Sequence, residues 1–119
     1  MKIKLKDIVL IISSQSALEP SWSPYRLSKL GIDGITKGMA QRLLEHGIIV
    51  NAIGPGPTNT SMQKNYREGN LYTPLNPIKR FTTPEEIAQI AKILVSDLGN
   101  TIVGQTIYMS GGRGIVEIR

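Results

Sequence analysis

The 119-residue chain carries 14 lysine and arginine residues against 9 aspartate and glutamate residues, and 40% of its residues are hydrophobic. This ordinary globular composition excludes a disordered or low-complexity protein, and the length suits a single domain over residues 1–119. The absence of cysteine excludes disulfides, thiolate metal ligands and a cysteine nucleophile, and one histidine argues against a histidine metal site.

The net charge of +5 does not by itself indicate nucleic acid. Lys2, Lys4 and Lys6 lie together at the start, but the other cations are scattered and no zinc-finger or RNA-binding signature occurs. The apolar run at residues 8–12 is shorter than the roughly seven to fifteen residues of a secretory signal, and no stretch approaches the roughly twenty of a membrane span. We therefore expect a cytoplasmic protein without a nucleic-acid or membrane partner.

The first predicted element is a strand over residues 8–12. Its isoleucine, valine and leucine residues do not alternate with polar ones, which is typical of a strand buried on both faces of a parallel sheet. Periodicity alone leaves a buried helix open. Residues 13–23, which are rich in serine and proline, predict a loop.

A helix follows this loop. Serine and proline at positions 23 and 24 favour a helix start, and Gly47 is a typical C-cap. Between them, apolar residues and glycines recur at steps of three and four residues. Gly31, Gly34 and Gly38 share one stripe, and because glycine weakens a helix, this stripe predicts a second helix packed close against it.

Residues 48–53 predict a second buried strand, which ends where the alternating glycines and prolines of residues 54–57 indicate a loop. Residues 58–82 show little periodicity and predict a long loop with one short helix near residues 61–68.

The last predicted elements are a helix and a third strand. Thr83 and Glu86 have the spacing of a capping box, so the helix begins there, and Gly99 is expected to close it. The third strand lies within residues 102–109, followed by a glycine turn at residues 111–112.

The alternation of strands and helices predicts an α/β fold. We expect a partial Rossmann-like, doubly wound parallel sheet of about three strands with flanking helices. Because ligands bind beyond the carboxyl ends of such strands, residues 13–14, 54–60 and 109–112 form the predicted functional rim.

One pair of side chains has suggestive chemistry. Tyr25 and Lys29 stand four residues apart on the predicted helix and therefore share a face. A neighbouring ammonium favours the phenolate of a tyrosine, which then serves as a proton donor and acceptor. On spacing alone, a surface tyrosine beside a solvated lysine is the better interpretation.

The surrounding motifs change that interpretation. Several short patterns occur in a fixed order: Ser13-Ser14, Tyr25-Arg-Leu-Ser-Lys29, Asn51-Ala52-Ile53-Gly54-Pro55-Gly56, Gly104-Gln105 and Gly111-Gly112. Over residues 8–112 this order resembles the second half of the short-chain dehydrogenase/reductase family.

The resemblance implies hydride transfer between NAD or NADP and a small-molecule alcohol or carbonyl. Tyr25 would be the catalytic acid/base, and Lys29 would bind the nicotinamide ribose and favour the Tyr25 phenolate. Ser14 would orient the reacting oxygen, with Ser13 left open because the segment leading to Tyr25 is short. These three residues, Ser14, Tyr25 and Lys29, are the predicted catalytic set.

The resemblance also implies cofactor contacts in the loop after the second strand. Pro55 and Gly56 would lie beside the nicotinamide, and Tyr25 and Lys29 would contact the cofactor from the helix. The backbone amide of Thr58 would meet the carboxamide, and the Thr60 hydroxyl would touch the cofactor. The position of Asn51 is structural in the family.

The sequence departs from the family at its start. No Gly-x-Gly-x-x-Gly or similar turn precedes Ser13, although such a turn holds the cofactor pyrophosphate in dinucleotide-binding folds. Two interpretations remain. The chain is a truncated or split oxidoreductase with little activity alone, or it is a non-catalytic interaction module. Either way we expect a homo-oligomer or association with a complementary N-terminal half.

Overall fold

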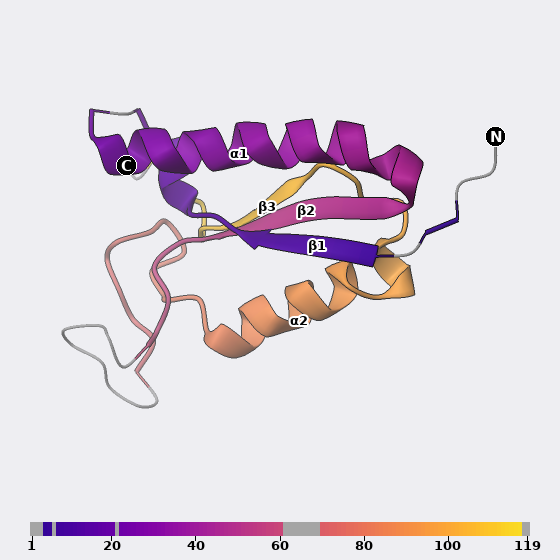
Figure 1. Ribbon diagram of the computed structural model, residues 1–119. Coiled ribbons are helices and arrows are strands. Elements are labelled where there is room, and N and C mark those ends of the chain that lie inside the picture. The colour runs from indigo at the N-terminus through magenta and orange to yellow at the C-terminus, as the bar shows by residue number, and fades with distance from the viewer. Residues whose placement is uncertain (1–3, 6, 21, 61–69, 118–119) are drawn as a thin grey trace.

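The computed structural model of the protein describes residues 4–5, 7–20, 22–60 and 70–117. In these ranges three parallel strands form one sheet in the order β1 (Asp7–Ile12), β2 (Ile48–Pro55) and β3 (Thr106–Met109). Helix α1 (Pro24–Leu43) covers one face of the sheet, and α2 (Pro84–Leu94) covers the other (Figure 1). The predicted α/β class and parallel sheet are confirmed. None of the described helices is long and apolar enough to cross a bilayer.

The core of the sheet is β2. Its aliphatic side chains at Ile49, Val50 and Ile53 are at most 1% exposed, because α1 and α2 cover its two faces and β1 and β3 pair with its two edges. The prediction of a strand buried on both faces is confirmed for this strand.

For β1 the same prediction is wrong. Its residues 8–11 are only half-buried and Ile12 is 57% exposed. β1 pairs with β2 alone, so its second edge has no partner strand within the described part of the chain. An apolar run therefore predicts a strand, but it does not predict how many strands pair with it.

Helix α1 begins as predicted. The Ser23 hydroxyl accepts a hydrogen bond of 3.2 Å from the Arg26 amide, with Pro24 in the first turn. After Leu43 a short 3₁₀ turn, η2 (Leu44–His46), ends at Gly47 in the left-handed conformation, with φ of 77°. Only glycine adopts this conformation readily. Gly47 therefore caps η2 and not α1, which ends at Leu43 with Leu44 as its C-cap.

The glycine stripe of α1 does not face a second helix among the residues that the structure describes. A Cβ built at Gly31, Gly34 or Gly38 meets no described atom within 4 Å. The helix instead turns Thr36 and Ala40 toward the sheet, where both are buried. The predicted close partner is therefore not found among the described residues, and the stripe lies on the outer face.

The second strand extends further than predicted, because Gly54 and Pro55 continue it rather than begin a loop. Gly54 pairs with Tyr108 and Pro55 with Met109 in the parallel ladder to β3. A Cβ at Gly54 would lie 2.5 Å from the Tyr108 ring, so only glycine fits beneath this tyrosine.

The capping box of α2 is confirmed. The Thr83 hydroxyl accepts from the Glu86 amide at 3.2 Å, and the Glu86 carboxylate accepts from the Thr83 amide at 3.1 Å. The helix ends at Leu94 and not at Gly99, which closes a separate 3₁₀ turn, η3 (Asp97–Gly99). The short helix predicted near residues 61–68 falls largely on residues 61–69, which lie outside the described ranges.

Candidate functional site

The carboxyl ends of the three strands meet at one edge of the sheet. The Ser13 amide donates to the Ile53 carbonyl at 2.7 Å, and the Gly56 amide donates to the Met109 carbonyl at 3.0 Å. A Cβ built on Gly56 would lie 2.8 Å from the Cα of Ser110. The chain segments that follow β1, β2 and β3 are therefore in close contact here, as the parallel topology requires.

Tyr25 and Lys29 lie at the start of α1 and are brought together as their spacing predicts. The Lys29 Nζ lies 5.4 Å from the centroid of the Tyr25 ring, within the range of a cation–π contact. Tyr25 is 58% exposed, and Lys29 is half-buried. The phenol is thus accessible to a reactant while an ammonium lies beside its ring.

The two serines after β1 have different environments. Ser13 is 5% exposed, and its Oγ has no hydrogen-bond partner among the described residues. Ser14 is half-buried, and its Oγ accepts a 3.2 Å hydrogen bond from the Ser16 amide, which caps the 3₁₀ turn η1 (Gln15–Leu18). That bond uses the hydroxyl as an acceptor and leaves its proton for another oxygen. Exposure therefore favours Ser14 over Ser13 as a residue that contacts a reactant.

The loop after β2 is held against the segment that precedes α2. The Asn59 amide donates to the Thr82 carbonyl at 2.8 Å, and the Thr82 amide donates to the Pro57 carbonyl at 3.0 Å. The Thr58 hydroxyl donates to the Gly56 carbonyl at 2.9 Å. Residues 55–60, including Thr60, are all half-buried on this rim.

The structural role of Asn51 is confirmed. Its buried side-chain amide donates to the Ile102 carbonyl at 2.7 Å and accepts from the Gln105 amide at 3.0 Å. The side chain thereby fixes the turn that leads into β3.

Sequence reasoning missed a partly buried polar contact between α1 and the first residue of β3. On α1, Asp33 accepts hydrogen bonds from the Thr106 hydroxyl at 2.7 Å and from the Lys37 ammonium at 3.1 Å. Burial acts to raise the pKa of Asp33, but these hydrogen bonds outweigh it and the net pKa is lowered. Burial, together with the Asp33 charge, raises the pKa of Tyr108.

A sequence signal for this contact existed. Tyr25, Lys29, Asp33 and Lys37 follow one another at four-residue steps, so they form one row along α1. The row runs from the exposed phenol to the ion pair of Asp33 and Lys37.

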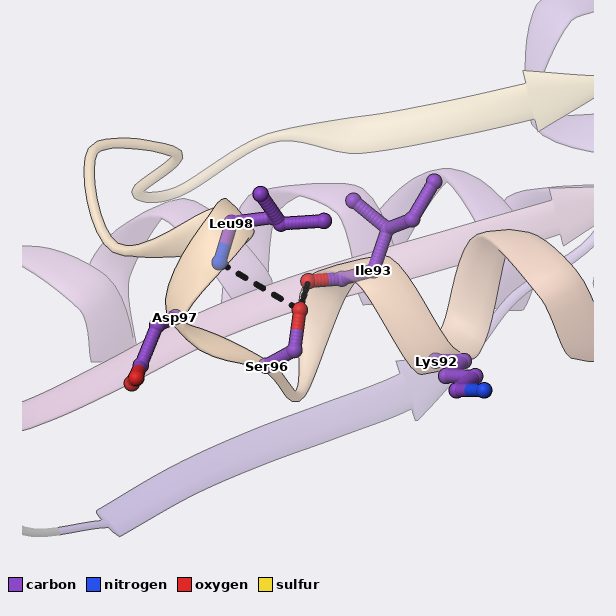
Figure 2. Close-up of a pocket in the computed structure, with 5 residues that line it drawn as sticks. All are labelled: Lys92, Ile93, Ser96, Asp97 and Leu98. Carbon is purple, nitrogen blue, oxygen red and sulfur yellow. Dashed lines mark hydrogen bonds between the residues drawn. The ribbon is translucent and has the colours of Figure 1, made fainter.

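A hollow of about 370 Å³ lies away from the rim. Figure 2 shows its five lining residues, at the end of α2 and in η3: Lys92, Ile93, Ser96, Asp97 and Leu98. The Ser96 hydroxyl is used internally, because it donates to the Ile93 carbonyl at 2.9 Å and accepts from the Leu98 amide at 3.3 Å. The hollow is mostly apolar, and its two charged lining residues are Lys92 and Asp97. Across the described ranges no group of acidic or histidine side chains has the arrangement of a metal site.

Comparison with known proteins decides the family. Residues 3–113 match the family model described as enoyl-(acyl carrier protein) reductase. The chain belongs to the short-chain dehydrogenase/reductase family. Its partial Rossmann-like sheet and the order of its motifs are those of this oxidoreductase family.

Individual relatives agree with this assignment. The chain is 39% identical over 95 residues to the 3-oxoacyl-[acyl-carrier-protein] reductase FabG of Thermotoga maritima, which covers 78% of this chain and 39% of that protein. It is 35% identical over 111 residues to human dehydrogenase/reductase SDR family member 4, covering 87% of this chain and 40% of that protein.

Among solved structures, acetoin dehydrogenase YohF from Salmonella typhimurium superposes with a TM-score of 0.82 at 30% identity, covering 94% of this chain and 46% of that structure. The chain therefore spans less than half the length of these relatives.

Proposed function

We propose that this chain supplies the acid/base half of an NAD- or NADP-dependent oxidoreductase that interconverts a small-molecule alcohol and a carbonyl compound. The observation that carries the proposal is the contact between the exposed Tyr25 phenol and the Lys29 ammonium, beside the carboxyl edge of the sheet. The family assignment supports the reaction class.

The proposed steps on the protein are proton movements. In the oxidation direction the Tyr25 phenolate takes the proton of the substrate hydroxyl, and in reduction the phenol returns a proton to the carbonyl oxygen. Lys29, whose ammonium lies 5.4 Å from the centroid of the Tyr25 ring, binds a ribose hydroxyl. Ser14 donates its hydroxyl proton to the reacting oxygen and so holds it near Tyr25. The bound nicotinamide supplies or accepts the hydride.

The rim suits the nicotinamide end of such a cofactor. A Cβ on Gly56 would lie 2.8 Å from the Ser110 Cα, so glycine at this position lets the loop after β2 pack directly against the segment after β3. Residues 57–59 are held in place by contacts with Thr82, and the Gly56 amide donates to the Met109 carbonyl, so the loop that carries Pro55, Gly56, Thr58 and Thr60 is anchored to the segments around it. We propose these four residues, with Tyr25 and Lys29, as the cofactor contacts.

We further propose that the 119-residue chain alone binds nicotinamide cofactors weakly and turns over poorly. The pyrophosphate is normally held by a glycine-rich turn, and no such pattern occurs in this sequence. Each lost hydrogen bond to a charged group is worth about 1.5 to 3 kcal/mol. Losing two weakens binding by roughly two to four orders of magnitude.

The second candidate function is a non-catalytic interaction module. The observation that favours it is the outer face of α1, where Leu27, Leu30 and Ile35 are each more than half exposed around the glycine stripe. We propose that a second copy of the chain covers this face, and that a complementary N-terminal half, where present, pairs with β1.

Catalysis is tested by joining this chain to the N-terminal half of a relative such as the Thermotoga reductase and comparing Tyr25→Phe with the parent. Loss of general acid/base catalysis lowers kcat by about 10² to 10⁴. The matched control is Tyr72→Phe, which changes a tyrosine of similar exposure away from α1. Undiminished turnover in the Tyr25→Phe protein overturns the proposed reaction. Ser14→Ala is expected to lower turnover more than Ser13→Ala.

Cofactor binding by the 119-residue chain is tested by isothermal titration with NAD and NADP. We expect no binding at micromolar concentrations. Micromolar affinity for either cofactor would contradict the proposal that the chain alone is a poor binder.

A further inference from the structure

The carboxylate of Glu19 lies between two arginines from opposite parts of the chain. Its Oε1 accepts a 3.2 Å hydrogen bond from the Arg113 Nε, and its Oε2 forms an ion pair of 3.1 Å with the Arg26 Nη2. The Glu19 side chain is only 16% exposed, whereas both arginine side chains are partly exposed. One half-enclosed carboxylate thus joins the segment before α1, the first turn of α1 and the C-terminal tail.

On the helix side, the contact involves the immediate neighbour of Tyr25. Arg26 donates from Nη1 to the Pro20 carbonyl at 3.0 Å, while its backbone amide donates to the Ser23 hydroxyl at 3.2 Å. The Arg26 side chain therefore folds back over residues 19–20 and fixes the direction in which the chain enters α1.

On the tail side, the residues after β3 fold back onto η1. Gly114 has φ of +83°, and a Cβ built on it would lie 2.9 Å from the Leu18 Cβ, so the tail backbone is in direct contact with η1. The Val116 amide donates to the Gly112 carbonyl at 2.8 Å, which closes the tail into a turn. This fold carries Arg113 to Glu19.

We infer that Glu19 is a positioning residue for Tyr25, which it serves by binding the Tyr25 end of α1 to the C-terminal tail through Arg26 and Arg113. The inference rests on the proposed function only in that Tyr25 is the acid/base. The C-terminal tail consequently helps to orient the Tyr25 phenol through Arg113, although no atom of the tail takes part in the reaction. Loss of either the carboxylate or the Arg113 guanidinium releases the first turns of α1.

The test compares Glu19→Gln and Arg113→Gln with the parent 119-residue chain by amide hydrogen exchange, resolved by NMR. Removing a partly exposed charged network of this kind is expected to speed exchange at residues 26–30 about fivefold in both variants. The contact between the Tyr25 ring and the Lys29 side chain, followed by nuclear Overhauser effects, weakens in both, and Arg113→Lys restores part of it. Exchange in β2 and α2 stays as in the parent.

Arg42→Gln is the matched control, because it removes an exposed arginine from the last turn of the same helix. Two results overturn the inference: exchange at residues 26–30 within twofold of the parent in both variants, or uniform acceleration that includes β2 and α2. If the Glu19→Gln variant does not fold, the exchange rates of Arg113→Gln alone test the inference. This variant keeps the ion pair between Glu19 and Arg26 and loses only the link to the tail. The measurement needs no cofactor or turnover, so its outcome is separate from that of Tyr25→Phe.

Discussion

Arg80 and Glu86 form a two-point ion pair, with Nη1 2.7 Å from Oε1 and Nη2 2.9 Å from Oε2. The Glu86 Oε1 also accepts a hydrogen bond from the Thr83 amide. One carboxylate therefore completes the capping box of α2 and, through Arg80, binds the loop that precedes this helix. Since residues 57–59 are in turn hydrogen-bonded to Thr82, this pair supports the loop that carries the candidate cofactor contacts.

The Arg80–Glu86 pair predicts a pH dependence of stability. Hydrogen bonds from Arg80 and the Thr83 amide lower the pKa of Glu86 from its ordinary 4.5 to about 2. Because the folded-state pKa is the lower one, the stabilisation is fully present above about pH 4.5 and is lost as the pH falls toward about 2.

Glu86→Gln keeps an acceptor for the Thr83 amide but removes the charge. We expect it to lower the free energy of unfolding by about 1 kcal/mol at pH 7, a value kept small because the pair is more than a third exposed. The difference from the parent should shrink toward pH 2, as measured by urea denaturation across this range. Glu85→Gln, at the next position on the first turn, is the control. A difference that stays constant with pH would contradict the assignment.

Lys79→Gly is expected to stabilise the protein. Lys79 has φ of 62°, the one positive value among the described non-glycine residues, and a side chain in this conformation costs roughly 1 to 2 kcal/mol. Glycine removes that cost but makes the unfolded chain more flexible, so the net gain in unfolding free energy is about 0.5 to 1 kcal/mol. Chemical denaturation measures it. Lys79→Ala, which keeps the strain, should be close to neutral; an equal gain from alanine would show that backbone strain is not the cause.

Gly54→Ala is expected to destabilise the sheet by about 2 kcal/mol, because the new methyl group would lie 2.5 Å from the Tyr108 ring in an overpacked site. Shortening the ring by Tyr108→Leu should make the two changes less damaging together than the sum of their separate effects. A double-mutant cycle of unfolding free energies gives the coupling. Strict additivity would mean that Tyr108 is not what excludes a side chain at position 54.

Gly34 tests the outer face of α1. In a single chain Gly34→Ala meets no atom within 4 Å and should stabilise the helix by about 1 kcal/mol. If a second copy covers this face as proposed, Gly34→Leu holds the helices apart and should weaken self-association about tenfold or more, as followed by sedimentation equilibrium. Gln89→Leu, on the exposed side of α2, is the control. A parent chain that stays monomeric over a wide concentration range would rule out the association.

Features set by neighbouring residues could be predicted from the sequence. The capping box of Thr83 and Glu86 and the approach of Tyr25 to Lys29 depend on spacings of three and four residues along one helix, so local geometry determines them. The parallel sheet followed from the alternation of strands and helices.

Features set by residues distant in sequence could not be predicted in this way. Gly54 belongs to a strand because β3, more than fifty residues later, pairs with it, and β1 lies at the edge of the described sheet with β2 as its one neighbour. Glu19 meets Arg113 across 94 residues. Ser13 and Ser14 are adjacent in the sequence, and only their burial in the fold distinguishes them.

The single-sided pairing of β1 gives the strand two alternating classes of backbone amide. The Asp7 and Ser13 amides donate toward the β2 side, to Gly47 and Ile53, and alternate residues of a strand point to opposite edges. The amides of Ile8, Leu10 and Ile12 therefore face the edge that no described strand covers. In deuterated water the amide hydrogens of these three residues should exchange quickly, whereas those of the residues between them should exchange slowly. A strand from another polypeptide that pairs with this edge would slow the three amides and remove the difference. Amide exchange at Ile8, Leu10 and Ile12 therefore measures directly whether a complementary N-terminal half pairs with β1.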